Sequence, residues 1–174
     1  ELLRALRAAC GDGFLIGVKL PGEDGMPQGV DLAMAKEITR LVHAGGVPDY
    51  LVWCWGSHAP TLHLHLPTHP GPAAPYLART VELAREAPDI PSGALGFIRT
   101  PAEAAHCLAQ PGIEFVQLGR PLLADPDWVA KAAAGRDSAI RRCIACNHCW
   151  GRIADGESLA CTVNPAGPAP TTTT

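Results

Sequence analysis

Several features that would point to nucleic acid, membranes or export are missing from this sequence. The formal net charge is −3 and there is no lysine or arginine run, so the chain lacks the cationic field that binds phosphate backbones. Its longest apolar stretches, such as residues 50–55, fall far short of the roughly 20 residues that a membrane-spanning helix needs. Residues 1–10 follow an amphipathic pattern and not that of a signal peptide. We therefore expect no nucleic-acid partner, no membrane segment and a cytoplasmic setting.

A dinucleotide fingerprint is also absent, because no G-x-G-x-x-G stretch follows the first expected strand. Disorder is not expected over most of the chain, since 47% of its 174 residues are hydrophobic and only 18% are charged. The seven cysteines are odd in number and unevenly spread. In a chain without signs of secretion, this distribution favours metal ligation over a disulfide framework.

Short apolar runs alternate with amphipathic stretches along the sequence. The expected strands are residues 13–22, 49–57, 92–97 and 113–120, and the expected helices are residues 31–46, 73–87, 100–112 and 125–135. Asp31, Thr100 and Asp125 are predicted to cap the helices that they precede. Buried strands between capped helices predict an α/β fold with a parallel sheet, either a doubly wound sheet or a barrel.

Two glycine turns follow expected strands, at residues 95–97 and 118–120. Missing side chains let backbone N–H groups approach an anion there, although a single turn glycine more often serves backbone geometry alone. Two such turns on consecutive strands, with Arg120 beside the second, predict one phosphate pocket. In a TIM barrel, the loops after the last two strands commonly form such a site.

The cysteines are concentrated near the end of the sequence. Four of them follow a C-x2-C-x2-C pattern plus one more after eleven residues: Cys143, Cys146, Cys149 and Cys161. Three thiolates in one compact run with a remote fourth favour a 4Fe-4S cluster, and zinc is the alternative. The other three cysteines lie in apolar patterns and are predicted to be small core residues: Cys10, Cys54 and Cys107.

Motifs in the last third of the chain resemble those of the Old Yellow Enzyme superfamily. They are EFVQLGRPLLADPDWVAKAAAGR, IRRCIACNHCW and LACTVNP. The resemblance is to the iron–sulfur branch, which includes trimethylamine dehydrogenase and 2,4-dienoyl-CoA reductase, and it implies an FMN-binding TIM (β/α)8 barrel followed by a 4Fe-4S segment. By motif, residues 1–140 would be strands five to eight of that barrel, 141–165 the cluster segment and 166–174 a disordered tail. The remainder of the barrel would come from upstream sequence.

The resemblance also assigns residues to the flavin. Lys19 stands where the family places a basic residue against the flavin pyrimidine edge, and a cation there stabilises negative charge on the reduced ring. A snorkelling surface lysine is the alternative. Gly96 and Phe97 match the first phosphate loop, where the family often has glycine at the second position, so Phe97 would narrow the pocket. Gly119 and Arg120 match the second phosphate loop.

The loop after the second expected strand is rich in tryptophan and histidine. Trp55 and His58 are candidates for substrate contact, by stacking, by caging an alkylammonium group or by relaying protons. The alternative is that tryptophans fill the barrel rim and histidines decorate a solvated loop. We expect this alternative for the other histidines of the loop: His63, His65 and His69.

The resemblance implies an oxidoreductase in which a small-molecule substrate or NAD(P)H passes a hydride to FMN and the cluster carries single electrons. The two expected reactions are reduction of an activated C=C bond and oxidative N-demethylation of a small amine, and the tryptophan pair favours the amine. The proton donor and substrate-anchoring residues of the family lie on strands before residue 1. A zinc- or cluster-binding structural module without activity is the non-enzymatic alternative.

Overall fold

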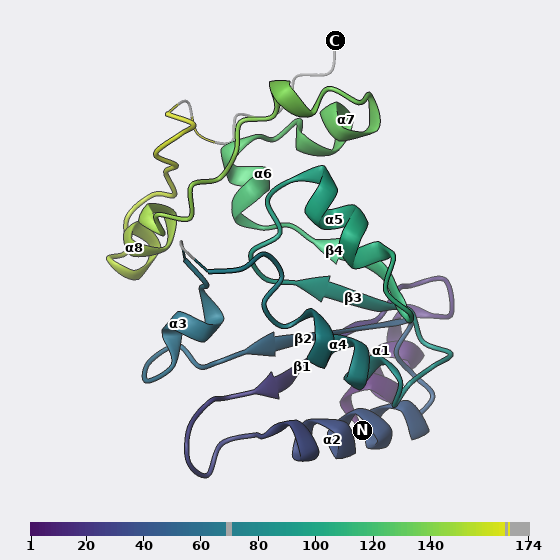
Figure 1. Cartoon of the computed structure of the whole chain (residues 1–174). Helices are drawn as coiled ribbons and strands as arrows, with labels where there is room; N and C mark the ends of the chain where they lie inside the picture. Colours follow the sequence, from purple (N-terminus) through teal and green to yellow (C-terminus); the bar gives the residue numbers. More distant parts are fainter. Residues whose placement is uncertain (69–70, 166, 168–174) are drawn as a thin grey trace.

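A computed structural model describes residues 1–68, 71–165 and 167, and shows strands alternating with helices (Figure 1). The strands are β1 (Gly17–Glu23), β2 (Tyr50–Trp55), β3 (Ser92–Leu95) and β4 (Ile113–Gln117). The longer helices are α1 (Leu2–Cys10), α2 (Leu32–Ala44), α4 (Leu77–Ala84) and α5 (Pro101–Leu108). The shorter ones are α3 (Leu62–His65), α6 (Arg120–Ala124), α7 (Trp128–Ala133), the 3-10 turn η1 (Asp137–Ala139) and α8 (His148–Ala154). The expected disordered tail, residue 167 excepted, and His69 lie outside the described residues.

The four strands form one parallel sheet in the order β1-β2-β3-β4. Helix α2 packs on β1, α4 on β1 and β3, and α5 on β4. Because each strand pairs with the next one in the chain and such crossovers are right-handed, the connecting helices cover the same face of the sheet. The predicted parallel α/β fold is confirmed. A strand order without reversal is that of a barrel wall and not of a doubly wound sheet.

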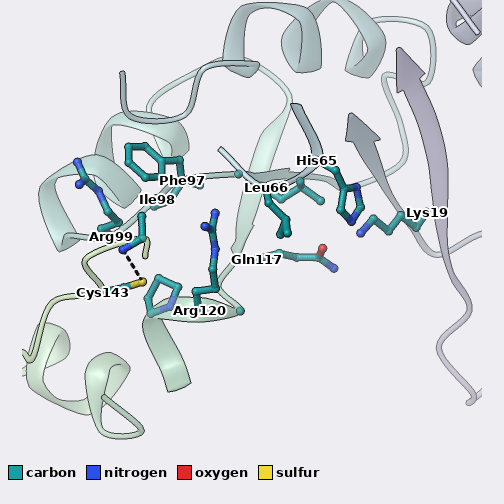
Figure 2. Close-up of a pocket in the computed structure, with 14 residues that line it drawn as sticks. Lys19, His65, Leu66, Phe97, Ile98, Arg99, Gln117, Arg120 and Cys143 are labelled. Carbon is teal, nitrogen blue, oxygen red and sulfur yellow. Dashed lines mark hydrogen bonds between the residues drawn. The ribbon is translucent and has the colours of Figure 1, made fainter. Parts of the chain in front are cut away.

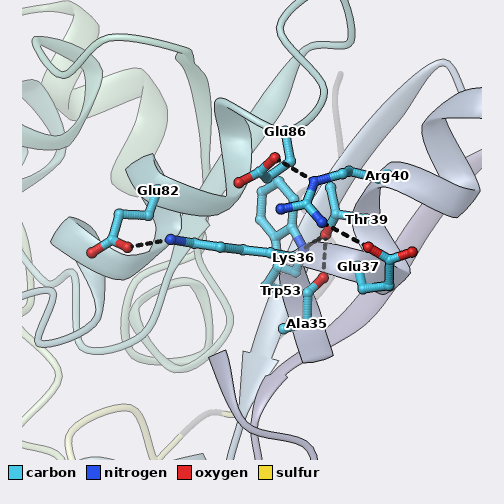
Figure 3. Close-up of polar contacts among 8 residues, drawn as sticks. All are labelled: Ala35, Lys36, Glu37, Thr39, Arg40, Trp53, Glu82 and Glu86. Atoms are coloured by element: carbon cyan, nitrogen blue, oxygen red, sulfur yellow. Dashed lines mark hydrogen bonds and ion pairs between the residues drawn. The ribbon is translucent and has the colours of Figure 1, made fainter. Parts of the chain in front are cut away.

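The helix-facing side of the sheet carries the core. Leu51 and Trp53 are fully buried there, and the Trp53 indole Nε1 donates a hydrogen bond of 3.0 Å to the Thr39 hydroxyl on α2 (Figure 3). The same hydroxyl donates to the Ala35 carbonyl at 2.8 Å, so the buried Thr39 is satisfied both as donor and as acceptor. This contact fixes the position of α2 on β2, the strand that carries Trp55.

Ion pairs join α2 to α4 and to the turn that follows it. Lys36 Nζ lies 2.7 Å from Glu82 Oε2, and Arg40 Nε lies 2.8 Å from Glu86 Oε2 (Figure 3). The hydrogen bond from Lys36 lowers the pKa of Glu82. Ion pairs at the surface are weakened by water and salt and contribute little, so buried packing and not these pairs holds the two helices.

The opposite face of the sheet, which would be the inside of a barrel, carries aromatic rings at its amino-terminal end. The rings of Tyr50 and Phe115 meet edge to face, with centroids 5.4 Å apart. A Cβ added at Gly17 would lie 1.9 Å from the Tyr50 ring, and one at Gly93 would lie 2.3 Å from the Phe115 ring. These two strand glycines therefore make room for the rings.

Two of the three predicted helix caps are present. The Asp31 carboxylate accepts from the Met34 N–H at 2.8 Å. Thr100 and Glu103 form a reciprocal capping box at the start of α5. Local sequence therefore sets these two helix starts correctly.

Asp125 does not cap a helix, which corrects the third prediction. Helix α7 begins at Trp128 after Asp127, three residues later than expected. The Asp125 side chain is only 2% exposed and accepts hydrogen bonds from Lys131 Nζ at 2.7 Å and from the Arg141 N–H at 2.8 Å. Burial alone would raise the pKa of this carboxyl, but the hydrogen bonds from these donors have the larger combined effect and lower it. Asp125 thus holds the chain at Arg141, where the cysteine-rich segment (residues 141–165) begins.

The prediction that three cysteines are core residues holds only in part. Cys107 is fully buried, and Cys54 is half-buried with its Sγ donating to the Leu20 carbonyl at 3.4 Å. Cys10 is exposed, so its prediction is wrong: it ends α1, a helix without a buried residue. Within the described part of the chain, none of the helices is both long and apolar enough to span a membrane.

Candidate functional site

A cavity of about 250 Å³ opens at the carboxyl-terminal end of the sheet (Figure 2). It is lined by Lys19 from β1, by both glycine turns, and by Cys143 and Ala145 from the cysteine-rich segment. All five residues assigned to the flavin therefore line one cavity: Lys19, Gly96, Phe97, Gly119 and Arg120. The cavity brings together segments from β1 to the cysteine-rich segment, which lie far apart in sequence.

The first glycine turn interrupts β3 earlier than expected. The strand ends at Leu95 because Gly96 has a φ of 99° and Phe97 a φ of 55°. Positive φ is costly for a bulky residue and is found mostly where the surrounding structure enforces it, often at functional sites. The Phe97 ring is buried and packs under the Arg99 guanidinium, 4.1 Å from the ring centroid. The turn thus brings Gly96 and Phe97 to the cavity wall, with the Phe97 ring held by packing.

The second glycine turn leaves an open cradle. A Cβ added at Gly119 would meet no atom within 4 Å, so the backbone borders free space. Beside it, Arg120 Nη1 donates to the Pro67 carbonyl at 3.0 Å and to Asn147 Oδ1. Among the described residues the Arg120 Nε and Nη2 atoms form no hydrogen bond, which leaves them for an anion in the cavity. An open backbone turn with a tethered arginine is suited to a phosphate group.

Lys19 lies beside His65 on the cavity wall (Figure 2). The pKa of His65 is lowered by burial first, then by the charge of His58, with smaller effects of Lys19 and Arg120. His65 is therefore neutral at pH 7. Sequence reasoning treated it as a loop histidine and missed it as a cavity residue.

Two further cavity residues were not singled out from sequence, Gln117 and Arg99. Gln117 ends β4 two positions after Phe115, so the alternation of a strand places both on the inner face. That parity was available in the sequence as a signal. Arg99 lies after the first glycine turn and also contacts Glu103 at 3.3 Å, a pairing that required the folded turn.

His58 and His65 form a direct contact. Their Nε2 atoms are 3.2 Å apart, and His65 Nδ1 lies 3.2 Å from the Trp55 carbonyl. Because a carbonyl only accepts, His65 carries its proton on Nδ1 and accepts at Nε2 from His58. Both imidazoles pack against Trp150 of α8, with ring centroids at 5.3 and 6.1 Å. The histidine-rich loop is therefore seated on the cysteine-rich segment.

Trp55 points away from this cavity. Its side chain is 2% exposed and stacks on Tyr76, with ring centroids 4.8 Å apart and planes at 17°. Trp53, two positions earlier, faces the helices in the same way. Trp55 is therefore directed toward the helix layer, because an odd position of β2 faces that layer. His58 is exposed near the cavity, and His63 is exposed on α3.

The compact cysteine run folds into turns that direct N–H groups at sulfur. The Ala145 N–H donates to Cys143 Sγ at 3.4 Å, and Ala145 and Asn147 both have positive φ, at 54° and 57°. The Thr162 hydroxyl and the His148 N–H lower the pKa of Cys146. N–H groups aimed at sulfur stabilise thiolates, which are the form that binds metal.

The four thiols are neighbours but are not preassembled into a metal cage. Burial raises the pKa of Cys143, and Cys149 and Cys161 add to this through their charges. Within residues 1–68, 71–165 and 167, no group of three or more His, Cys, Asp or Glu side chains is placed to hold a metal ion. All four cysteines are free, and the donor set suits iron–sulfur or zinc.

Side chains of the cysteine-rich segment fasten it to the sheet domain. The buried Asn164 donates from Nδ2 to the Leu123 carbonyl at 3.0 Å, and Arg141 Nη1 donates to the Ala124 carbonyl at 3.0 Å. Both acceptors belong to α6, the helix that follows the second glycine turn. Helix α6 therefore connects the cavity with the cysteine-rich segment.

Comparison with known proteins gives matches along most of the chain. The chain is 32% identical over 170 residues to an NADH oxidase of Thermoanaerobacter brockii, which covers 95% of this chain and 25% of that protein. It is 30% identical over 176 residues to a probable N-methylproline demethylase of Rhizobium meliloti (strain 1021). This match covers 95% of this chain and 25% of that protein. The chain thus spans about a quarter of the length of these relatives.

Solved structures show the same fold. A 2-naphthoyl-CoA reductase in complex with 2-naphthoyl-CoA superimposes with a TM-score of 0.86 at 23% identity, over 94% of this chain and 25% of that one. The family model described as NADH:flavin oxidoreductase / NADH oxidase matches residues 1–139. These findings confirm the resemblance that the motifs indicated. The chain therefore belongs to the NADH:flavin oxidoreductase / NADH oxidase family.

Proposed function

We propose that this chain is the cofactor-binding part of an FMN- and 4Fe-4S-dependent oxidoreductase. One observation carries the proposal: Lys19, both glycine turns and Arg120 line the same cavity as Cys143. Membership of a flavin oxidoreductase family supports FMN as the occupant. We further propose that residues 1–140 are strands five to eight of a TIM barrel, and that residues 141–165 hold the cluster in a cytoplasmic enzyme.

The residues of the cavity divide the work of holding FMN. The backbone of Gly96, Phe97 and Gly119 would hold the phosphate, with Arg120 supplying charge. Lys19 would stabilise negative charge at the flavin pyrimidine edge. When bound, FMN exchanges hydrides and a 4Fe-4S cluster exchanges single electrons, so the pair connects two-electron with one-electron chemistry.

The cysteine segment would hold the cluster close to the flavin. Four thiolates would be the ligands: Cys143, Cys146, Cys149 and Cys161. The N–H group of Ala145, 3.4 Å from Cys143 Sγ, lowers the cost of negative charge on the cluster sulfurs. Because Cys143 lines the flavin cavity, electrons would have a short path between the two groups.

The proposed substrates are small molecules, with NAD(P)H as a candidate hydride donor. The two candidate reactions are reduction of an activated C=C bond and oxidative N-demethylation of a small amine. An N-methylproline demethylase among the relatives supports the second. Trp55 and His58 are the proposed substrate-contacting residues of the loop; His58 is exposed and contacts His65, whereas Trp55 is buried.

The remaining barrel strands would come from a longer polypeptide. Both sheet edges, β1 and β4, are unpaired in the described residues, and the relatives are about four times as long as this chain. Strand edges of a barrel are satisfied only when the barrel closes. Full activity is therefore proposed for the complete protein.

Anaerobic purification and FMN titration test the proposal. We expect a flavin spectrum with a broad iron–sulfur shoulder, and iron rather than zinc in elemental analysis. Gly119→Ala adds a methyl group to open space beside the cavity and should weaken FMN binding without lowering stability. Gly13→Ala is the matched control, since its Cβ also meets nothing within 4 Å and Gly13 precedes the amino-terminal end of β1, whereas the cavity lies at the carboxyl-terminal end of the sheet. A colourless protein that contains zinc would support the structural-module alternative instead.

A further inference from the structure

Three segments meet at the Arg120 side chain. Its Nη1 atom donates to the Pro67 carbonyl of the histidine-rich loop at 3.0 Å and to Oδ1 of Asn147, which lies between Cys146 and Cys149. Arg120 also lines the cavity proposed for FMN. One guanidinium group is thus shared between the flavin cavity and the cysteine loop.

We propose that Asn147 is a positioning residue that holds Arg120 ready for the cofactor phosphate, and that it thereby couples FMN binding to the order of the cysteine loop. This inference rests on the proposed function. It assigns a role to a residue that is neither a thiol ligand nor part of the cavity wall.

The Arg120 side chain is preorganised by its two acceptors. A free arginine side chain populates many rotamers, so the binding of an anion to it is weakened by the loss of side-chain conformational entropy. The two acceptors on Nη1 order the Arg120 guanidinium before any ligand arrives. They leave Nε and Nη2, one edge of the planar group, for a phosphate in the cavity.

An asparagine at position 147 suits both the backbone conformation and the contact with Arg120. Asn147 has φ 57° and ψ 14°, a left-handed conformation that asparagine tolerates better than most residues. Its amide oxygen accepts from Arg120, and its Nδ2 lies 3.5 Å from the Leu66 carbonyl. Because the amide is neutral, it fixes Arg120 without cancelling the charge that would bind phosphate. An aspartate here would fix the side chain and cancel its charge.

The coupling through Asn147 acts in both directions. Asn147 belongs to the turn between the second and third cysteines of the compact run and precedes α8. Any ligand that holds Arg120 therefore also restrains this turn, and a cluster that orders the turn holds Arg120. By thermodynamic linkage, each cofactor must then strengthen the binding of the other by the same factor.

The experiment measures the FMN dissociation constant by flavin fluorescence under anaerobic conditions, before and after iron is removed with a chelator. Asn147→Gly keeps the left-handed backbone accessible and deletes the carboxamide. We expect it to raise the dissociation constant about tenfold, as for one long side chain that loses its order. His148→Ala is the matched control, because His148 is exposed and its side chain forms no hydrogen bond among the described residues. The FMN dissociation constant of this variant should equal that of the wild type.

Two further variants separate positioning from general damage to the fold. In an Arg120→Ala background, Asn147→Gly should have no additional effect, since both changes remove the same interaction. Asn147→Asp should retain iron but weaken FMN binding. Removal of iron should weaken FMN binding in the wild type and leave it unchanged in Asn147→Gly.

Two results would overturn the role of Asn147. One is a wild-type FMN dissociation constant in Asn147→Gly. The other is that Asn147→Gly weakens FMN binding by the same factor in the Arg120→Ala background as in the wild type. In that case the wild type still binds FMN and iron, and the proposed function stands. If the wild type binds neither FMN nor iron, the proposed function itself fails and this inference falls with it.

Discussion

Replacement of Asp125 by asparagine should loosen the attachment of the cysteine-rich segment. The Asp125 carboxylate is 2% exposed and accepts from Lys131 Nζ at 2.7 and 2.9 Å, from the Arg141 N–H at 2.8 Å and from the Asp127 N–H at 3.1 Å. The substitution would remove the counter-charge of Lys131. It would also turn one acceptor oxygen into a donor that faces other donors.

The size of the effect follows from burial. Removal of one partner from a fully buried ion pair costs about 3 to 5 kcal/mol, and a charge-assisted hydrogen bond contributes about 1.5 to 3 kcal/mol. The Lys131 side chain is 20% exposed, so water relieves part of its lost pairing. We therefore expect Asp125→Asn to lower the free energy of unfolding by about 2 to 4 kcal/mol.

Urea unfolding in the presence of a reductant measures this free energy, with Asp127→Asn as an exposed control that should be neutral. The pKa of Asp125 lies below its ordinary value of 3.8, although burial alone would raise it, because Lys131 and backbone N–H groups favour the carboxylate. A depressed carboxyl pKa stabilises the fold above the unfolded value and loses that effect as the pH falls through the folded value. The difference between wild type and variant should thus persist from about pH 7 to about pH 5 and shrink below about pH 4.

The same variant has a readout at the cysteines. Arg141 lies two residues before Cys143, and its N–H loses its acceptor when the carboxylate is replaced. Alkylation of Cys143 should therefore be faster in Asp125→Asn than in wild type. A loss below about 1 kcal/mol with unchanged alkylation would refute the clamp role of Asp125.

Three more predictions concern the core, the inner face and the cavity. Thr39→Val leaves the Trp53 indole N–H without its acceptor in a fully buried position, and should lower the free energy of unfolding in urea by about 1 to 3 kcal/mol. Gly93→Ala places a Cβ 2.3 Å from the Phe115 ring and should lower the free energy of unfolding in urea by about 1 to 3 kcal/mol. Phe115→Leu should restore part of this free energy in the double variant. Because burial lowers the pKa of His65 from 6.5, the unfolded chain takes up a proton that the folded chain resists, so stability falls as the pH drops below that value. His65→Gln should show a smaller decline of the urea midpoint between about pH 7.5 and pH 5.5, and an unchanged decline would contradict this origin.

Local chemistry was enough to predict much of the fold. Asp31 and the Thr100–Glu103 pair cap helices as expected, because a cap depends only on residues within one turn. The glycine turns were also predicted, because their freedom to adopt unusual backbone angles is a property of the residue itself. Asp125 failed as a cap because its carboxylate finds stronger partners in Lys131 and the distant Arg141 N–H.

The cavity residues show where prediction from sequence stopped. Trp55 is buried against Tyr76, and His65, which was expected in a solvated loop, lines the cavity. The parity of a strand decides which way Trp55 points, and that parity depends on the register with neighbouring strands. His65 was brought to the cavity by a turn that packs against Trp150, far along the chain.

The sequence by itself determined the alternation of strands and helices, the glycine turns, the spacing of the four thiols and hence the family. Only the tertiary structure decided that Arg120 reaches Asn147, that Asp125 clamps Arg141 and that Trp55 faces the helices. The reason is physical. Caps, turns and ligand spacings depend on interactions within a few residues, whereas the direction of a side chain and the partner it meets depend on strand register and long-range packing.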